Sequence, residues 1–167
     1  MNVNSQPPST VAGYLLTRLA QASLISVFGV PGDGSLGLLD AVAAQPGLNW
    51  IAMATEQGAA CAAGSYARLR GIGAVVTTSG AGELSAMSAI AGAYAGSVPV
   101  VHIIGTPALA TGGPGAKPRL GRPGRDRRHF LRMAAQITEA LGPAAGPVAL
   151  RASTPDELAW ALDEATH

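Results

Sequence analysis

Glu56 is the residue whose setting in this chain most suggests chemistry. It lies in an apolar stretch, and no other Asp, Glu, Lys or Arg occurs between Asp40 and Arg68. A fold that buried this carboxyl group would raise its pKa, because a carboxylate is poorly tolerated away from water. Such a group can share a proton near neutral pH. The alternative is structural, since an acid at the start of a helix favours the helix dipole.

Two glycine-rich segments are the next candidates, Gly29-Val-Pro-Gly-Asp33 and Thr77-Thr-Ser-Gly-Ala-Gly-Glu83. Neither has the Gly-Lys-Ser/Thr ending of a phosphate-binding loop, and neither matches the dinucleotide fingerprint. Their glycines would instead let the backbone approach a flat ligand closely. Asp33 has two interpretations from the residues alone, a functional acid or a turn residue that caps a helix.

Short apolar strands alternate with helices in the elements that must position these residues. Strands are predicted at 26–30, 50–54, 74–78 and 98–104, and helices at 10–19, 35–44, 57–70 and 83–95. This alternation indicates an α/β fold, a three-layer parallel sheet with helices on both faces. Ligands of such sheets bind beyond the carboxyl ends of the strands. The segments 29–34, 54–57 and 77–83 are therefore expected to meet along one edge.

One domain, at 10–140, accounts for most of the chain and follows a disordered N-terminus at 1–9. Within it, 108–128 is rich in Gly, Pro and Arg, which is typical of a flexible loop, and helical spacing resumes at 129–140. Residues 141–167 indicate a linker and a C-terminal helix. The fold would place a last strand after that helix, and none follows it.

Charged residues make up only 13% of the 167 residues, about half the usual share. We therefore expect part of the surface to be covered by another chain. Aromatic residues make up 4%, too few to offer a stacking surface for nucleic-acid bases. Basic residues gather at 117–132, where either a solvated loop or a contact with an anionic partner is possible.

Two further features bear on location. Prolines and glycines interrupt the uncharged stretch at 84–116, so no membrane span is expected there. Cys61 is the single cysteine and cannot form an internal disulfide, which indicates a reducing compartment and a cytoplasmic location. Its alanine-rich surroundings predict that Cys61 is a small buried core residue.

Four segments, taken together, resemble the N-terminal pyrimidine-binding domain of thiamine-diphosphate enzymes, nearest the pyruvate and indolepyruvate decarboxylases, which act on alpha-keto acids. They are Phe28-Gly-Val-Pro-Gly-Asp33, the Glu56 segment with Gly64-Ser-Tyr-Ala-Arg68, Thr77-Thr-Ser-Gly-Ala-Gly-Glu-Leu-Ser-Ala86 and Val98-Pro-Val-Val-His-Ile-Ile-Gly105. The resemblance extends over 10–107 and resumes at 129–138.

The resemblance implies roles for five residues. Glu56 matches the glutamate that hydrogen-bonds the aminopyrimidine ring of thiamine diphosphate and so activates the cofactor. Asp33 matches an acid that handles the substrate carboxylate and later proton transfers. Pro31, Gly32 and Ala81 match positions that pack near the pyrimidine. His102, inside an apolar strand, is instead expected to be a hydrogen-bonded core residue.

Two departures from the family pattern leave the activity open. The adjacent histidine pair of the decarboxylases is absent from 117–126, and the chain has no diphosphate-binding domain with its metal motif. Magnesium is therefore expected only with a partner that carries that domain. Three hypotheses remain: a cofactor-binding domain that is inactive alone, one subunit of a split 2-oxo acid decarboxylase, or a non-catalytic module with a basic loop. The expected partners are a second copy or a separate diphosphate-binding chain, with a small 2-oxo acid as substrate.

Overall fold

The computed structural model describes residues 10–105, 132–134 and 137, and every statement below concerns these residues. Helices and strands alternate along them, in the order α1 (Val11–Gln21), β1 (Ser26–Gly29), α2 (Leu36–Ala44), β2 (Asn49–Ala52), α3 (Glu56–Arg70), β3 (Gly73–Thr78), α4 (Ala81–Ala95) and β4 (Val100–Gly105). The predicted elements are thus confirmed, with ends that shift by a few residues. The expectations for 1–9, 108–128 and 141–167 lie outside the described residues.

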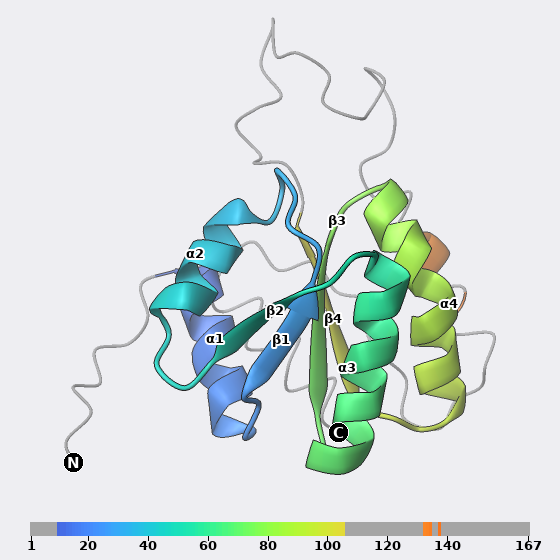
Figure 1. Cartoon of the computed structure of the whole chain (residues 1–167), viewed down its shortest axis with the longest axis horizontal. Coiled ribbons are helices and arrows are strands. Elements are labelled where there is room, and N and C mark those ends of the chain that lie inside the picture. Colours follow the sequence, from blue (N-terminus) through green and yellow to red (C-terminus); the bar gives the residue numbers. More distant parts are fainter. Residues whose placement is uncertain (1–9, 106–131, 135–136, 138–167) are drawn as a thin grey trace, which may run out of the picture.

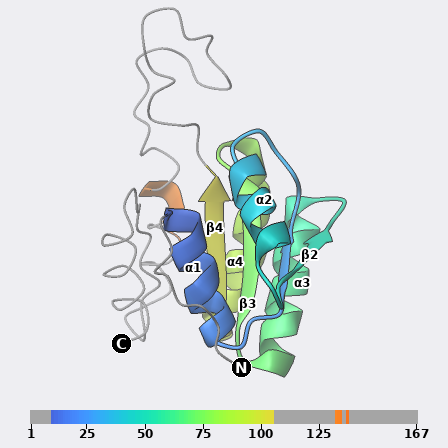
Figure 2. The ribbon, with the colours of Figure 1, turned by 90° about the vertical axis from the view of Figure 1, so that its left-hand side faces the viewer.

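All four strands form one parallel sheet in the order β2-β1-β3-β4. Helices α1 and α2 lie on one side of this sheet, and α3 and α4 lie on the other (Figure 1). The view turned by 90° places α1 and α2 in front of the strands (Figure 2). This is the three-layer α/β arrangement that the alternation of strands and helices predicts. None of the described helices has the length and apolar character needed to span a membrane.

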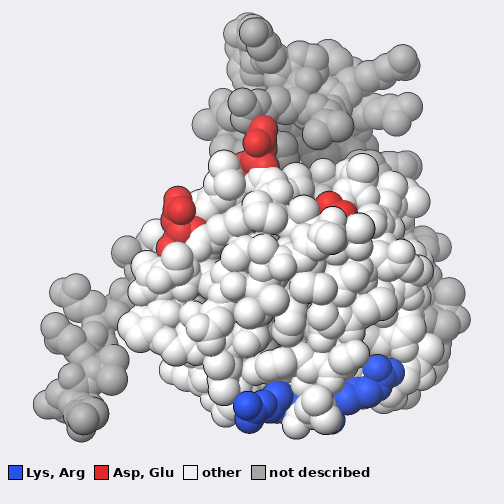
Figure 3. All heavy atoms as spheres, in the orientation of Figure 1, with Lys and Arg blue, Asp and Glu red and all other residues white. Residues whose placement is uncertain are grey.

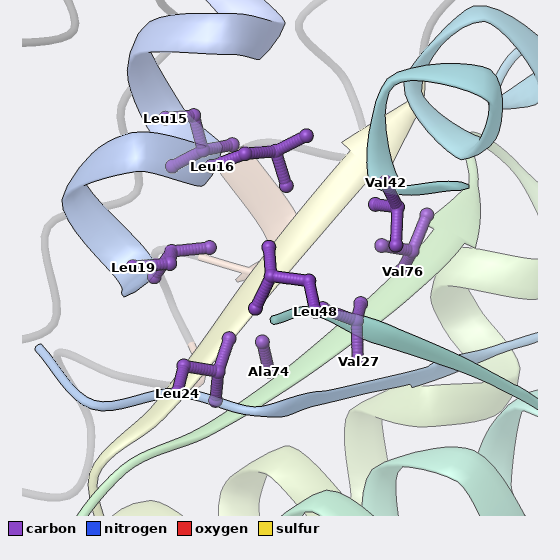
Figure 4. Packing of buried hydrophobic residues seen from close by; sticks show 9 residues of the cluster. All are labelled: Leu15, Leu16, Leu19, Leu24, Val27, Val42, Leu48, Ala74 and Val76. Atoms are coloured by element: carbon purple, nitrogen blue, oxygen red, sulfur yellow. The ribbon is translucent and has the colours of Figure 1, made fainter. Parts of the chain in front are cut away.

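An apolar cluster fills each side of the sheet. The cluster under α1 and α2 contains branched side chains: Leu15, Leu16, Leu19, Leu24, Val27, Val42, Leu48, Ala74 and Val76 (Figure 4). The cluster under α3 and α4 is built mainly of alanine: Ala59, Ala60, Ala63, Val75 and Ala86. Successive residues of β3 therefore alternate between the two clusters, as the pleat of a strand requires.

Small residues bring α3 unusually close to the sheet. A side chain at Gly73 of β3 would collide with the backbone carbonyl of Ala63 in α3. The helix ends at Gly71, whose φ of 90° lies in the left-handed region that glycine tolerates best. The high alanine and glycine content of the chain thus corresponds to close packing of helix α3 against the sheet.

Candidate functional site

The turns that follow β1, β2 and β3 meet at one edge of the sheet. Each of three glycines there faces another loop so closely that an added Cβ would press against it. Gly32 faces the hydroxyl of Thr78, Gly34 faces the backbone of Gly105, and Gly82 faces the carboxylate of Glu56. The expected meeting of 29–34, 54–57 and 77–83 along one edge is therefore confirmed.

Glu56 is the first residue of α3 and lies at this edge. Thr55 caps the helix, because its hydroxyl oxygen accepts a hydrogen bond from the Gly58 amide at 3.1 Å. The Glu56 side chain is half-buried. A Cβ at Gly82 would lie 2.8 Å from its Oε1 atom, so the carboxylate rests directly on the glycine backbone of α4. Glu56 thus starts a helix, as the structural alternative expected, and its side chain is half-buried at the shared edge rather than fully buried.

The first turn of α4 contains the acid that is buried in the described part of the chain. Glu83 is 2% exposed, and its Oε2 atom accepts hydrogen bonds from the Ser79 hydroxyl and the Gly80 amide, each at 3.4 Å. Burial raises the pKa of Glu83, and the two hydrogen bonds oppose that rise only in part. Sequence reasoning missed this residue. The available signal was an acid three positions after a helix cap, the capping-box spacing.

Gly80 gives this turn its shape. Its φ of 107° and ψ of −123° belong to a region that residues with a side chain rarely adopt. The following residue, Ala81, is exposed as the first residue of α4, and Gly82 comes next. The backbone of this turn is also tied to the sheet, because the Ser79 amide donates a hydrogen bond to the Gly105 carbonyl at 2.9 Å.

The β1–α2 turn carries the other predicted site residues. Pro31 and Asp33 are exposed there, and Gly32 is half-buried. Ser35, rather than Asp33, is the N-cap residue of α2, and its hydroxyl accepts from the Gly32 amide at 3.2 Å and donates to the Gly32 carbonyl at 2.9 Å. Asp33 is thus a turn residue before the N-cap position of α2, as one of its two interpretations expected, and its role as a functional acid stays a prediction.

A buried hydroxyl lies beneath this turn. The Thr78 Oγ1 atom, at the end of β3, is buried without a hydrogen-bond partner in the described structure, directly under Gly32. Buried polar atoms are nearly always paired, so an orphaned one at a loop-lined edge has free capacity for a hydrogen bond. The same edge carries the Glu56 carboxylate, which lies against the Gly82 backbone.

Charge is distributed unevenly over the described structure. Arg18 lies in the last turn of α1, and Arg68 and Arg70 lie in the last turn of α3, at the end of the sheet opposite Glu56. On the face shown in Figure 3, basic side chains gather at one end and acidic ones toward the other, with an uncharged band between them. The described residues contain no cluster of His, Cys, Asp or Glu that could hold a metal ion. The three arginines are thus too far from the edge to hold an anionic group there.

His102 is a core residue, as expected. It lies in β4, and its Nε2 atom is 2.8 Å from the Thr77 hydroxyl of β3. Burial lowers the pKa of His102 to about 4. Cys61, in contrast, is exposed, so the expectation of a buried cysteine was wrong. Successive residues of an α-helix are about 100° apart around its axis. Ala59, Ala60 and Ala63 lie on the buried face of α3, so Cys61 lies on the exposed face.

Acid is expected to destabilise the fold through His102. The unfolded chain binds a proton near pH 6.5, whereas folded His102 does so only near pH 4. Its contribution to the free energy of unfolding is therefore present above about pH 6.5 and lost as the pH falls toward 4. We expect a loss of about 2 kcal/mol over that range, measured by urea unfolding. His102→Gln, which keeps a hydrogen-bonding group for Thr77, should flatten this dependence; parallel losses in both proteins would contradict it.

The parallel sheet and the loops that meet at its carboxyl edge define an α/β domain with its candidate functional residues at that edge. The sequence profile of the family described as thiamine pyrophosphate enzyme, N-terminal TPP binding domain, matches residues 9–130. The chain therefore belongs to this family, and its resemblance to the pyrimidine-binding domain is confirmed. Thiamine pyrophosphate is another name for thiamine diphosphate, so the family implies this cofactor.

The chain is also similar to bacterial alpha-keto-acid decarboxylases. It is 48% identical to that of Mycobacterium tuberculosis (strain ATCC 25618 / H37Rv), 47% to that of Mycobacterium ulcerans (strain Agy99) and 46% to that of Mycobacterium avium (strain 104), each over 134 residues. These alignments cover 80% of this chain and 24% of each relative. The chain thus spans about a quarter of the length of the relatives that it matches.

Proposed function

We propose that this chain holds the aminopyrimidine half of thiamine diphosphate at the carboxyl edge of its sheet, with Glu56 as the acceptor for the ring. The observation that carries the proposal is the position of the Glu56 carboxylate, fixed at the first turn of α3 against Gly82. A carboxylate accepts a charge-assisted hydrogen bond, which is stronger than a neutral one, and its half-buried position reduces competition from water.

The neighbouring residues fit a flat ring. The Gly32 and Gly82 backbones let the loops approach closely, and Pro31 and Ala81 lie beside them at the same edge. When bound, the cofactor supplies the electron sink for cleaving the bond to a carboxylate. Glu56 would hold a proton on the ring, and the exposed Asp33 carboxyl group would handle protons near the substrate.

The diphosphate requires more than the described residues offer. A diphosphate is held chiefly by cationic side chains and metal ions, and the arginines of α1 and α3 lie at the end of the sheet opposite Glu56. We therefore infer that the chain is inactive alone, and that a diphosphate-binding chain with its magnesium ion completes a 2-oxo acid decarboxylase. The alternative partner is a second copy of this chain. The third hypothesis, a basic binding loop, concerns 117–132, of which 117–131 lie outside the described residues.

Two features of the sequence support a partner and a location. Charged residues are scarce, at 13% of the chain, and the face in Figure 3 has an uncharged band wide enough to be covered. A separate partner would co-elute with the chain in size-exclusion chromatography, whereas a second copy would give a dimer without it. The single cysteine supports a reducing compartment, and we propose the cytoplasm.

Ligand titration by NMR tests the pyrimidine site. We expect thiamine and thiamine diphosphate to bind the isolated chain with similar, weak affinity, because the ring is held and the diphosphate is not. Glu56→Gln should weaken both about tenfold or more, since hydrogen bonds to charged groups contribute about 1.5–3 kcal/mol. Asp40→Asn, which neutralises an exposed acid on α2, is the matched control and should bind normally. Unchanged binding in Glu56→Gln would sink the proposal.

A further inference from the structure

Glu83 is the buried acid of the described chain, and it is not part of the proposed cofactor contacts. Its side chain is 2% exposed at the third position of α4, while the carboxylate of Glu56 remains half-buried. Burying a carboxyl group is unfavourable unless hydrogen bonds compensate for the lost water. Its two compensating contacts are local, since both donors, the Ser79 hydroxyl and the Gly80 amide, belong to the turn that precedes the helix.

That turn is the support on which Glu56 rests. Gly80 has a φ of 107°, and because glycine adopts many backbone conformations, local contacts decide which of them this turn keeps. Two residues later, Gly82 packs against the Glu56 carboxylate so closely that an added Cβ would lie 2.8 Å from Oε1. A change in the Gly80 dihedral angles would move Gly82 and with it the surface behind the carboxylate. The hydrogen bonds of Glu83 and the position of Glu56 are therefore linked by two residues of backbone.

We propose that Glu83 is a positioning residue for Glu56: its carboxyl oxygen holds the Ser79–Gly80 turn, so that the Gly82 backbone fixes where the Glu56 carboxylate can sit. The inference rests on the proposed function, because only that function gives the position of Glu56 a role. The contacts among Glu83, the Ser79–Gly80 turn and Gly82 do not depend on it. Glu83 does not touch the ligand edge. It acts through the turn, as a support that keeps the acceptor in one place before the ring arrives.

The test follows Glu56 directly, without any cofactor. The chain is labelled with carboxyl-13C glutamate, and the Glu56 resonance is assigned by its loss in Glu56→Gln. Two variants then separate the roles of hydrogen bonding and charge: Glu83→Gln keeps an acceptor oxygen, and Glu83→Met keeps the length of the side chain without one. Ser85→Ala, on an exposed position of the same helix, is the control.

We expect Glu83→Met to shift the carboxyl 13C resonance of Glu56, because the surroundings of the carboxylate change. Glu83→Gln and Ser85→Ala should leave it within error. Equal shifts in the Met and Gln variants would overturn the proposal, because the charge of Glu83 would then be what matters. An unchanged Glu56 resonance in a folded Glu83→Met protein would overturn it as well.

Thermal unfolding of each variant reports its structural effect separately. If Glu83→Met fails to fold, Ser79→Ala decides, since it removes one of the two donors and leaves the buried acid in place. A shifted Glu56 resonance in Ser79→Ala supports the proposal, and an unshifted one overturns it. None of these measurements uses a ligand. A chain that failed to bind thiamine would therefore refute the proposed function, whereas the Glu56 resonance would still test the role of Glu83.

Discussion

Gly82→Ala is expected to weaken thiamine binding by about 10–100-fold, as much as Glu56→Gln, while the fold becomes no less stable. The new methyl group would lie 2.8 Å from Oε1, 3.3 Å from Cδ and 3.5 Å from Cγ of Glu56. The Glu56 side chain must therefore leave the position it occupies. Stability should not fall, because the atoms nearest the new methyl group belong to the end of the flexible Glu56 side chain, and alanine is a better helix former than glycine.

Gly82→Ala is informative because it is expected to weaken thiamine binding without lowering the stability of the fold. Most substitutions that impair a site also destabilise the protein, and the two losses are then hard to separate. Gly92→Ala is the matched control, because Gly92 lies on the same helix and has nothing within 4 Å of an added Cβ. It should raise the unfolding temperature and leave thiamine binding unchanged. Normal thiamine affinity in a folded Gly82→Ala protein would show that Glu56 is not the acceptor.

The elements that build the edge follow from local sequence signals. Continuous apolar strands such as Gly73–Thr78 and helix caps such as Thr10 and Thr55 act over a few residues, and the structure has both. Parallel pairing then requires that the turns meet, whatever the details of packing. The position of Glu56 at the edge could therefore be predicted from the sequence, because it depends only on the strand that precedes it.

Burial of individual side chains could not be predicted in the same way. Cys61 and Ala60 are neighbours in an alanine-rich helix, and only the contact of α3 with the sheet decides that Ala60 is buried and Cys61 exposed. Glu83 lies in the first turn of α4, after glycines that suggested an open ligand loop, yet its side chain is buried and its carboxyl group accepts hydrogen bonds from Ser79 and Gly80. Both outcomes depend on tertiary packing, which the spacing of residue types along the chain does not encode.

Leu16→Ala is expected to lower the free energy of unfolding by about 2–5 kcal/mol, a large share of the total stability of a domain of this size. Leu16 is 1% exposed and lies in the cluster between α1 and the sheet (Figure 4). Its loss removes apolar burial and leaves a cavity that the neighbouring leucines fill only in part. Urea unfolding should show a lower midpoint with an unchanged slope, the sign of a stability change alone.

Leu69→Ala is the control for this loss, because Leu69 is 86% exposed and its removal should change stability by less than about 0.5 kcal/mol. Leu16 lies on the α1 side of the sheet, whereas Glu56 and Gly82 belong to helices on the other side (Figure 1). The folded Leu16→Ala protein should therefore bind thiamine like the original chain. A loss of binding in conditions where it remains folded would mean that the two layers are coupled, and that the edge depends on the whole sheet rather than on the contact between α3 and α4.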